Sequence, residues 1–111
     1  MTRVAAIDCG TNTIRLLIAE ADRDDSGRPR LEVLRRRNEI VRLGQGVDRT
    51  GLLDPEALER TLAAVASYAA DCAELCVAPG GDVRRFVATS ATRDARNRED
   101  FVAGVRRLLG I

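Results

Sequence analysis

The sequence predicts an α/β domain in which three antiparallel strands are followed by a helix, a strand parallel to the first, and a second helix. Three observations lead to this prediction. Short runs of strand type fill the first forty residues, whereas helical periodicity begins only after residue 54. A fourth strand-like run then lies between the two helical segments. A strand reached through a helical crossover pairs in parallel, which adds it to the sheet of the first three.

The composition of the 111 residues fits one globular domain with a modest core, because 45% of them are hydrophobic and 32% are charged. The net charge of +1 argues against a nucleic-acid polymer as a partner. All 18 basic residues are arginine. This segment therefore offers no histidine base, no histidine metal ligand and no lysine of the kind that binds phosphate in Walker-type loops.

The sequence contains no signal-peptide pattern and no run approaching the ~18 apolar residues of a membrane span. Its three cysteines, Cys9, Cys72 and Cys76, are odd in number and are not arranged as a disulfide framework. We therefore expect a reduced, cytoplasmic protein without a membrane partner.

The first two strands follow one another closely. Arg3–Ile7 is predicted as a short buried strand, and the alternation of Ile14, Leu16 and Ile18 with their neighbours has the period of a second strand. The segment Asp22–Arg30 contains Asp-Asp-Ser-Gly-Arg-Pro, a cluster of turn residues. We expect this segment to form a hairpin tip in solvent.

Leu31–Leu43 is predicted as a third strand with mixed faces. Its run Arg35–Arg37 has two interpretations, a phosphate-binding patch or the solvated stretch of an edge strand. The edge strand is favoured, because charge there discourages edge-to-edge pairing with other chains. The residues that follow, Leu43–Asp48 with Thr50 and Gly51, are expected to form a loop.

A long helix is predicted next, with Asp54 as its N-cap, Pro55 at the first helical position and Glu56 in the first turn. Its apolar positions step by four and three residues and form one helical stripe. Both later cysteines lie on this stripe, so they are expected on the core face, packed rather than paired on a metal. The stripe consists of Leu58, Leu62, Val65, Ala69, Cys72 and Cys76.

Val83–Ala88 is predicted as the fourth strand, and Thr89–Arg93 leads away from it. A last helix is expected to start at Asn97. Its buried stripe is predicted to consist of Phe101, Val105 and Leu108.

The turn after the first strand has the residues of an anion site. Its sequence context is AAIDCGTNTIRLLIAE. Asp8, at the strand end, is suited to hold Mg²⁺ directly or through water, and Gly10 lets the backbone approach an anion closely. Arg15, on the next strand, is suited to bind phosphate oxygens. Further donors come from the side chains of Thr11, Asn12 and Thr13. The same residue types also form ordinary hairpin turns, and residue types alone do not separate these two interpretations.

A second polar corner, TSATRDARN, covers residues 89–97. Its hydroxyls and helical N–H groups could face the same anion, with Arg93 as a second cationic clamp. Alternatively, Thr89, Ser90 or Thr92 caps the helix and Arg93 lies in solvent. Taken alone, capping is favoured. Parallel neighbouring strands would, however, bring both corners to the same edge of the sheet.

Three ordered motifs resemble those of the exopolyphosphatase and guanosine pentaphosphate phosphohydrolase family. AAIDCGTNTIRLLIAE is similar to its first phosphate loop, VRLGQGVDRTGLLDPEALERTL to its next signature, and ATSATRDARNREDFV to its third. The family belongs to the superfamily of actin, sugar kinases and heat-shock ATPases. A sugar kinase or an actin relative would share the first loop but not the other two. Together the motifs span nearly all of the chain.

The resemblance implies an RNase H-like α/β fold and Mg²⁺-dependent hydrolysis of a terminal phosphoanhydride, in inorganic polyphosphate or pppGpp. It implies that Asp8 holds the metal and that Arg15 and Arg93 are catalytic charge clamps. A homodimer is an assembly common in the family. The resemblance also implies phosphate binding by Gly10, Thr11, Asn12, Thr13, Thr89 and Ser90.

The family's catalytic glutamate and its second glycine-rich phosphate loop lie beyond the third motif, and this chain contains neither. We therefore expect residues 1–111 to be the N-terminal portion of the first domain of a longer phosphatase. The rest of that domain and the second domain would lie outside the chain. The alternative that stays open is a standalone, non-catalytic module that binds phosphate or a nucleotide.

Overall fold

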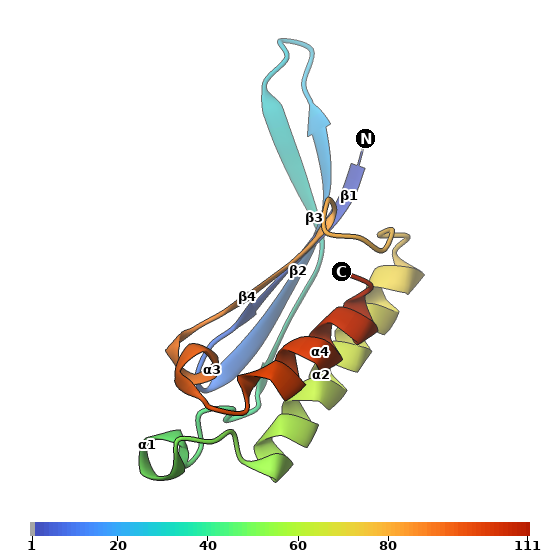
Figure 1. The fold of residues 1–111 in the computed structure, drawn as a ribbon. Coiled ribbons are helices and arrows are strands. Elements are labelled where there is room, and N and C mark those ends of the chain that lie inside the picture. The colour runs from blue at the N-terminus through green and yellow to red at the C-terminus, as the bar shows by residue number, and fades with distance from the viewer. Residues whose placement is uncertain (1) are drawn as a thin grey trace.

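The computed structural model describes residues 2–111, with the backbone but not the side chain of Ser90 (Figure 1). A four-stranded sheet carries helices on one face. The strands are β1 (Thr2–Cys9), β2 (Thr13–Arg23), β3 (Pro29–Ile40) and β4 (Arg84–Ala88). The helices are α1 (Val47–Thr50), α2 (Pro55–Glu74), α3 (Ser90–Asp94) and α4 (Arg98–Leu109).

The strand order in the sheet is β3-β2-β1-β4. β1 pairs antiparallel with β2, and β2 pairs antiparallel with β3. β4 pairs parallel to β1, from Ala5 opposite Arg84 to Cys9 opposite Ala88. The predicted meander and the parallel fourth strand are therefore confirmed, and β3 lies at an edge as expected.

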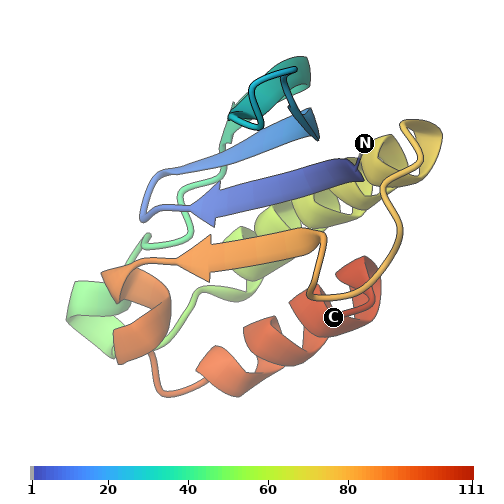
Figure 2. The ribbon, with the colours of Figure 1, turned by 90° about the horizontal axis from the view of Figure 1, so that it is seen from above.

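Both long helices cover the same face of the sheet (Figures 1 and 2). The side chains that point to them alternate along each strand, as a half-buried sheet requires. Among residues 2–111, no helix covers the opposite face, which we call the open face. The larger side chains buried from the central strands are Ile7 and Cys9 on β1, and Ile14, Leu16 and Ile18 on β2.

α2 begins as predicted, because the Asp54 carboxylate accepts a hydrogen bond from the Ala57 N–H. Its buried stripe differs from the prediction, since the helix packs against both the sheet and α4. Tyr68 is fully buried, and its hydroxyl donates to the Ile14 carbonyl at 3.2 Å. The buried residues of α2 are Ala57, Thr61, Ala64, Val65, Tyr68 and Cys72.

The expectation that both later cysteines face the core is wrong for Cys76. α2 ends at Glu74, and Cys76 turns the chain in the left-handed region with φ of 60°. The helical period therefore stops before Cys76, whose side chain is exposed, while Cys72 is buried. The two thiols do not share a face.

Thiol labelling at neutral pH is expected to modify Cys76 and to spare Cys9 and Cys72. Burial, with a smaller effect of the Asp8 carboxylate, raises the pKa of the Cys9 thiol to about 12, and burial also raises the pKa of Cys72. Mass spectrometry after a short iodoacetamide pulse should show one adduct in the native protein and three after unfolding. Native labelling at Cys9 as fast as at Cys76 would contradict the buried position.

Two short helices were not predicted, because elements of four or five residues have too few positions to show a periodicity. α1 lies where a continuous loop was expected, between Gly46 and Gly51, both in the left-handed region. α3 follows β4 directly. The Arg96 N–H donates to the Gly51 carbonyl at 2.9 Å, which ties the two short helices together at one end of the sheet (Figure 2).

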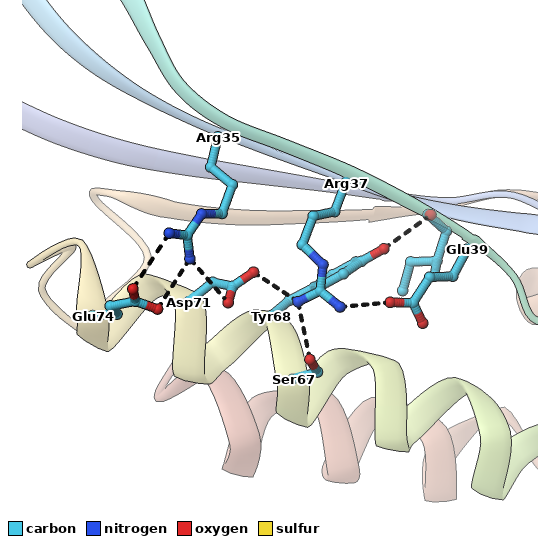
Figure 3. Close-up of polar contacts among 8 residues, drawn as sticks. Arg35, Arg37, Glu39, Ser67, Tyr68, Asp71 and Glu74 are labelled. Carbon is cyan, nitrogen blue, oxygen red and sulfur yellow. Dashed lines mark hydrogen bonds and ion pairs between the residues drawn. The ribbon is translucent and has the colours of Figure 1, made fainter.

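The run Arg35–Arg37 is not a solvated stretch, because two of its members bind α2 (Figure 3). The Arg37 guanidinium donates to the Asp71 carboxylate at 2.7 Å and lies 5.0 Å from the Tyr68 ring centroid. Arg35 forms ion pairs with Asp71 at 3.2 Å and with Glu74 at 3.1 Å. These contacts fasten the edge strand to the helix.

Arg84, the first residue of β4, is a buried cation held by carbonyl groups. Its guanidinium donates to Val77 O at 2.7 Å and to Leu109 O at 3.1 Å. Leu109 is the last residue of α4, where a positive charge complements the helix dipole. Arg84 therefore joins the C-terminal ends of the helical layer to the start of the fourth strand.

Replacing Arg84 by alanine is expected to lower the free energy of unfolding by about 2–4 kcal/mol, because two buried carbonyls lose charged donors. Arg85 is the matched control, since its side chain is exposed on the opposite face of the same strand. Arg85→Ala should cost less than about 0.5 kcal/mol. Chemical denaturation measures both variants, and equal losses would contradict the role assigned to Arg84.

Candidate functional site

The carboxyl ends of β1 and β4 lie side by side and carry the two polar corners of the sequence. Asp8 pairs with Val87, and Cys9 pairs with Ala88. The Thr89 N–H then donates to the Cys9 carbonyl at 3.1 Å. The parallel pairing thus places the start of the second corner directly against the first.

The turn at residues 10–13 is held by its backbone. The Gly10 N–H donates to Thr13 O at 2.9 Å, and Asn12 O accepts from Val41 N at 2.9 Å. Thr11 O accepts from Gly44 N at 2.8 Å. The carbonyls of Thr11 and Asn12 are therefore bound by residues 41–44, while the side chains of these two residues stay exposed. Those side chains are available to a ligand.

Gly44 is a residue whose importance the sequence analysis missed. A Cβ at this position would lie 2.2 Å from Thr11 Cγ2 and 3.4 Å from Ala91 Cβ. The loop 41–44, the turn 10–13 and the start of α3 therefore meet at a point that has no room for a side chain. The glycines of the second motif, VRLGQG, were the signal that could have indicated this close approach.

Gly44→Ala is expected to displace Thr11 and to weaken any ligand bound by the turn, because the Cβ contact of 2.2 Å cannot be kept. Gly81→Ala is the matched control, since a Cβ at Gly81 meets no atom within 4 Å. In ¹H–¹⁵N spectra, Gly44→Ala should shift the amides of residues 10–13 and Gly81→Ala should leave them in place. Unmoved turn amides in Gly44→Ala would contradict the packing described here.

Asp8 and Arg15 lie opposite each other on β1 and β2, and both are exposed on the open face. Asn38 lies opposite Arg15 on β3. This cross-strand row borders a groove of about 410 Å³ over the sheet. The residues that line the groove include Ala6, Asp8, Arg15, Leu17, Asn38 and Val87. Among residues 2–111, Asp8 is the only carboxylate that lines this groove.

The structure does not bring Arg93 to the groove. Its side chain is 76% exposed and its Nε lies 3.8 Å from the Asp94 carboxylate of the same helix. Thr89 is the N-cap residue of α3 but forms no side-chain cap hydrogen bond. The Ser90 hydroxyl, predicted to bind phosphate, lies outside the described part of the molecule. The two arginines predicted as clamps therefore differ in position, since Arg15 borders the groove and Arg93 lies on α3.

Residues 18–111 match the model of the Ppx/GppA phosphatase family. The chain belongs to this family. Exopolyphosphatase 2 of Mycobacterium tuberculosis is 50% identical over 99% of this chain, which covers 33% of that protein. A bifunctional 3-dehydroquinate synthase/phosphatase of Fusobacterium nucleatum is 37% identical over 91% of the chain, which covers 15% of that protein.

Solved structures of Ppx/GppA proteins share the fold. The Aquifex aeolicus family member superposes with a TM-score of 0.82 at 34% identity, covering 99% of this chain and 33% of that one. An exopolyphosphatase-like protein gives 0.83 at 46% identity, covering 99% and 31%. The predicted RNase H-like fold of the actin superfamily is therefore confirmed. The chain spans about a third of the length of exopolyphosphatase 2 and of these solved Ppx/GppA proteins.

The donor set of this Ppx/GppA chain fits a magnesium ion held largely by water and substrate. Residues 2–111 contain no group of three or more acidic, cysteine or histidine side chains that could enclose a metal, so no all-protein cage is available there. Mg²⁺ is commonly held by one or two carboxylates, with water and substrate phosphates completing its coordination. The exposed Asp8 carboxylate beside the groove suits that mode.

Of the helices in residues 2–111, none combines the length and apolar character that a membrane crossing needs.

Proposed function

We propose that this chain forms the part of a phosphoanhydride hydrolase that binds the terminal phosphates of inorganic polyphosphate. The observation that carries the proposal is the placement of Asp8 and Arg15 opposite each other on the open face, beside the exposed turn 10–13. Relatives named exopolyphosphatase, one of them 50% identical, support the choice of substrate. pppGpp, the second substrate implied by the sequence, has the same terminal anhydride.

The chemical roles follow from the residue types. Arg15 presents a planar guanidinium that binds two phosphate oxygens at once and neutralises charge on the transferred group. Exposed Thr11 and Asn12 donate to further oxygens, as does the Thr89 hydroxyl from the second corner. Asp8 would hold Mg²⁺, which supplies charge neutralisation at the phosphate oxygens when bound. The role of Arg93 as a second clamp requires its exposed side chain to turn toward the groove when substrate is present.

The Cys9 thiol has no chemical role in this proposal. It lies directly between Asp8 and Gly10 but its side chain is buried in the core, where substrate does not reach it. We propose water as the nucleophile of the reaction. We propose that the glutamate that activates this water comes from the part of the family sequence that the chain does not cover.

The test uses a full-length form, in which the 111 residues continue into the two-thirds of the family sequence that they do not cover. Orthophosphate release is measured from long-chain polyphosphate and from pppGpp, each with and without Mg²⁺. We expect Mg²⁺-dependent release with a higher kcat/KM for polyphosphate. Release from neither substrate would refute the function, and a higher kcat/KM for pppGpp would reassign the substrate.

A further inference from the structure

The second motif of the sequence, VRLGQGVDRTGLLDPEALERTL, supplies no residue to the proposed phosphate site, yet its first residues bind the turn of the first motif. The N–H groups of Val41 and Arg42 both donate to Asn12 O, at 2.9 and 3.0 Å. The Gly44 N–H donates to Thr11 O at 2.8 Å. Two successive carbonyls of the turn are therefore fixed by the second motif.

The two fixed carbonyls determine where the turn directs its N–H groups. A trans peptide unit directs its C=O and its N–H to opposite sides. Because Thr11 O points to Gly44, the N–H of the same peptide unit, that of Asn12, points away from it. Among the atoms described for residues 2–111, this N–H has no hydrogen-bond acceptor. Backbone donors directed outward from a turn are the groups that bind anions in backbone nests.

Arg60 of α2 contacts both ends of residues 41–45, which we call the support loop. Its Nε donates to Val41 O at 3.0 Å, and its guanidinium donates to the side-chain oxygen of Gln45 at 3.2 Å. Val41 is buried, and no other donor among the described atoms of residues 2–111 binds its carbonyl. A buried carbonyl without a donor is costly, so the contact with Arg60 holds the start of the support loop against α2.

The support loop has a backbone conformation that needs such contacts. Arg42 adopts a φ of 50°, in the left-handed region that residues other than glycine rarely occupy. Conformations of this kind persist where the surrounding structure holds them. Arg60 binds the carbonyl directly before Arg42, and the Gln45 N–H donates to the Arg42 carbonyl at 3.1 Å. Loss of Arg60 would remove one of the contacts that keep the loop in this conformation.

The helix gives Arg60 a fixed base. Ala57 and Thr61, three residues before it and one residue after it, are buried in the packed face of α2. Arg60 itself is exposed over much of its side chain, so its replacement opens no cavity in the core. The effect of a substitution at Arg60 is therefore expected to stay in the loop that it contacts.

We infer that Arg60 is a positioning residue for the turn 10–13 and acts on it through the support loop. The guanidinium holds Val41 against α2, and the N–H groups of the loop hold the carbonyls of the turn. The turn in turn keeps the Asn12 N–H directed away from the loop, toward the phosphate. This inference rests on the proposed function, since it concerns the turn to which that function assigns phosphate binding.

The experiment compares Arg60→Met with the parent in the full-length form, because methionine keeps the helix propensity and removes both donors. With polyphosphate and Mg²⁺, kcat should fall about tenfold, since a displaced turn no longer orients the phosphate. KM should stay within about threefold, because Asp8 and Arg15 are unchanged. Hydrogen exchange followed by mass spectrometry should show faster exchange at residues 41–44, with β4 and α4 unchanged.

Arg49→Met is the matched control. It removes an exposed arginine from α1, beside the same loop, whose side chain has no hydrogen bond or ion pair among the described atoms of residues 2–111. It should change neither kcat nor the exchange of residues 41–44. An equal fall of kcat in this control would overturn the inference, since it would indicate a general effect of charge.

The remaining outcomes separate the inference from the proposed function. An active parent with unchanged kcat in Arg60→Met would refute the positioning role and leave the phosphate site in place. Faster exchange that extends to β4 and α4 would also refute it, because it would indicate general destabilisation. If the parent releases no phosphate, the proposed function fails, and unchanged exchange at residues 41–44 in Arg60→Met would then refute the hold of Arg60 on the support loop as well.

Discussion

The 111-residue chain on its own is expected to release no measurable phosphate from polyphosphate, whereas the full-length form should turn it over. Asp8 is the carboxylate of the groove lining, and in the proposed site it is engaged with Mg²⁺ rather than positioned as the base that activates water. Loss of a positioned base typically removes ~10²–10⁴-fold of rate. Loss of the rest of the charged site removes more.

Two other acidic residues do not replace the missing base. Glu99 and Asp100 lie in the first turn of α4, are exposed, and complement the helix dipole there. The measurement is phosphate release by the purified chain beside the full-length form, at equal concentrations and with Mg²⁺. Turnover by the chain that matches the full-length form would show that the base lies within these residues.

The second large effect is expected for Arg15→Ala in the full-length form. A charge clamp in a closed site contributes about 2–4 kcal/mol to transition-state stabilisation, which corresponds to a fall of about 10²–10³-fold in kcat/KM. The melting temperature should change little, because Arg15 is exposed on the open face and surface substitutions seldom cost more than about 0.5 kcal/mol.

Arg93→Ala tests the second predicted clamp in the same assay. If Arg93 turns toward the groove when substrate binds, its loss should also lower kcat with an unchanged melting temperature. Arg107→Ala serves as the control, because it removes an exposed arginine from the last turn of α4. Normal turnover in Arg15→Ala would refute its clamp role, and normal turnover in Arg93→Ala alone would leave Arg15 as the single clamp.

The sequence was sufficient where the signal was local. The carboxylate of Asp54, followed by Pro55, has a recognisable capping pattern, and the helix starts there. Alternation in β2 likewise identified the buried side chains Ile14, Leu16 and Ile18. These patterns are set by helix and strand geometry, so they can be read without knowing what packs against them.

The sequence was insufficient where the signal depends on tertiary structure. Adjacent arginines have identical chemistry. The pleat of β3 places Arg35 and Arg36 on opposite faces of the sheet, and the position of α2 decides that Arg35 is the one bound by carboxylates. Cys76 continues the helical period in the sequence, but the helix ends two residues earlier, at Glu74. The contact between Gly44 and Thr11 joins residues from two separate motifs. The packing around the candidate site is therefore set by contacts that the sequence does not show.

The pairing of β4 with β1 has a consequence for the synthesis of the protein. Ala5 of β1 pairs with Arg84 of β4, so the ribosome synthesises this partner strand roughly 80 residues after β1. At 5–20 residues per second, the interval is about 4–16 s. The meander and α2 are synthesised before then. Until β4 is made, the backbone N–H and C=O groups on this edge of β1 have no strand to pair with. The yield of folded chain should therefore depend on elongation speed between these two strands, a dependence that the stability of the finished sheet does not reveal.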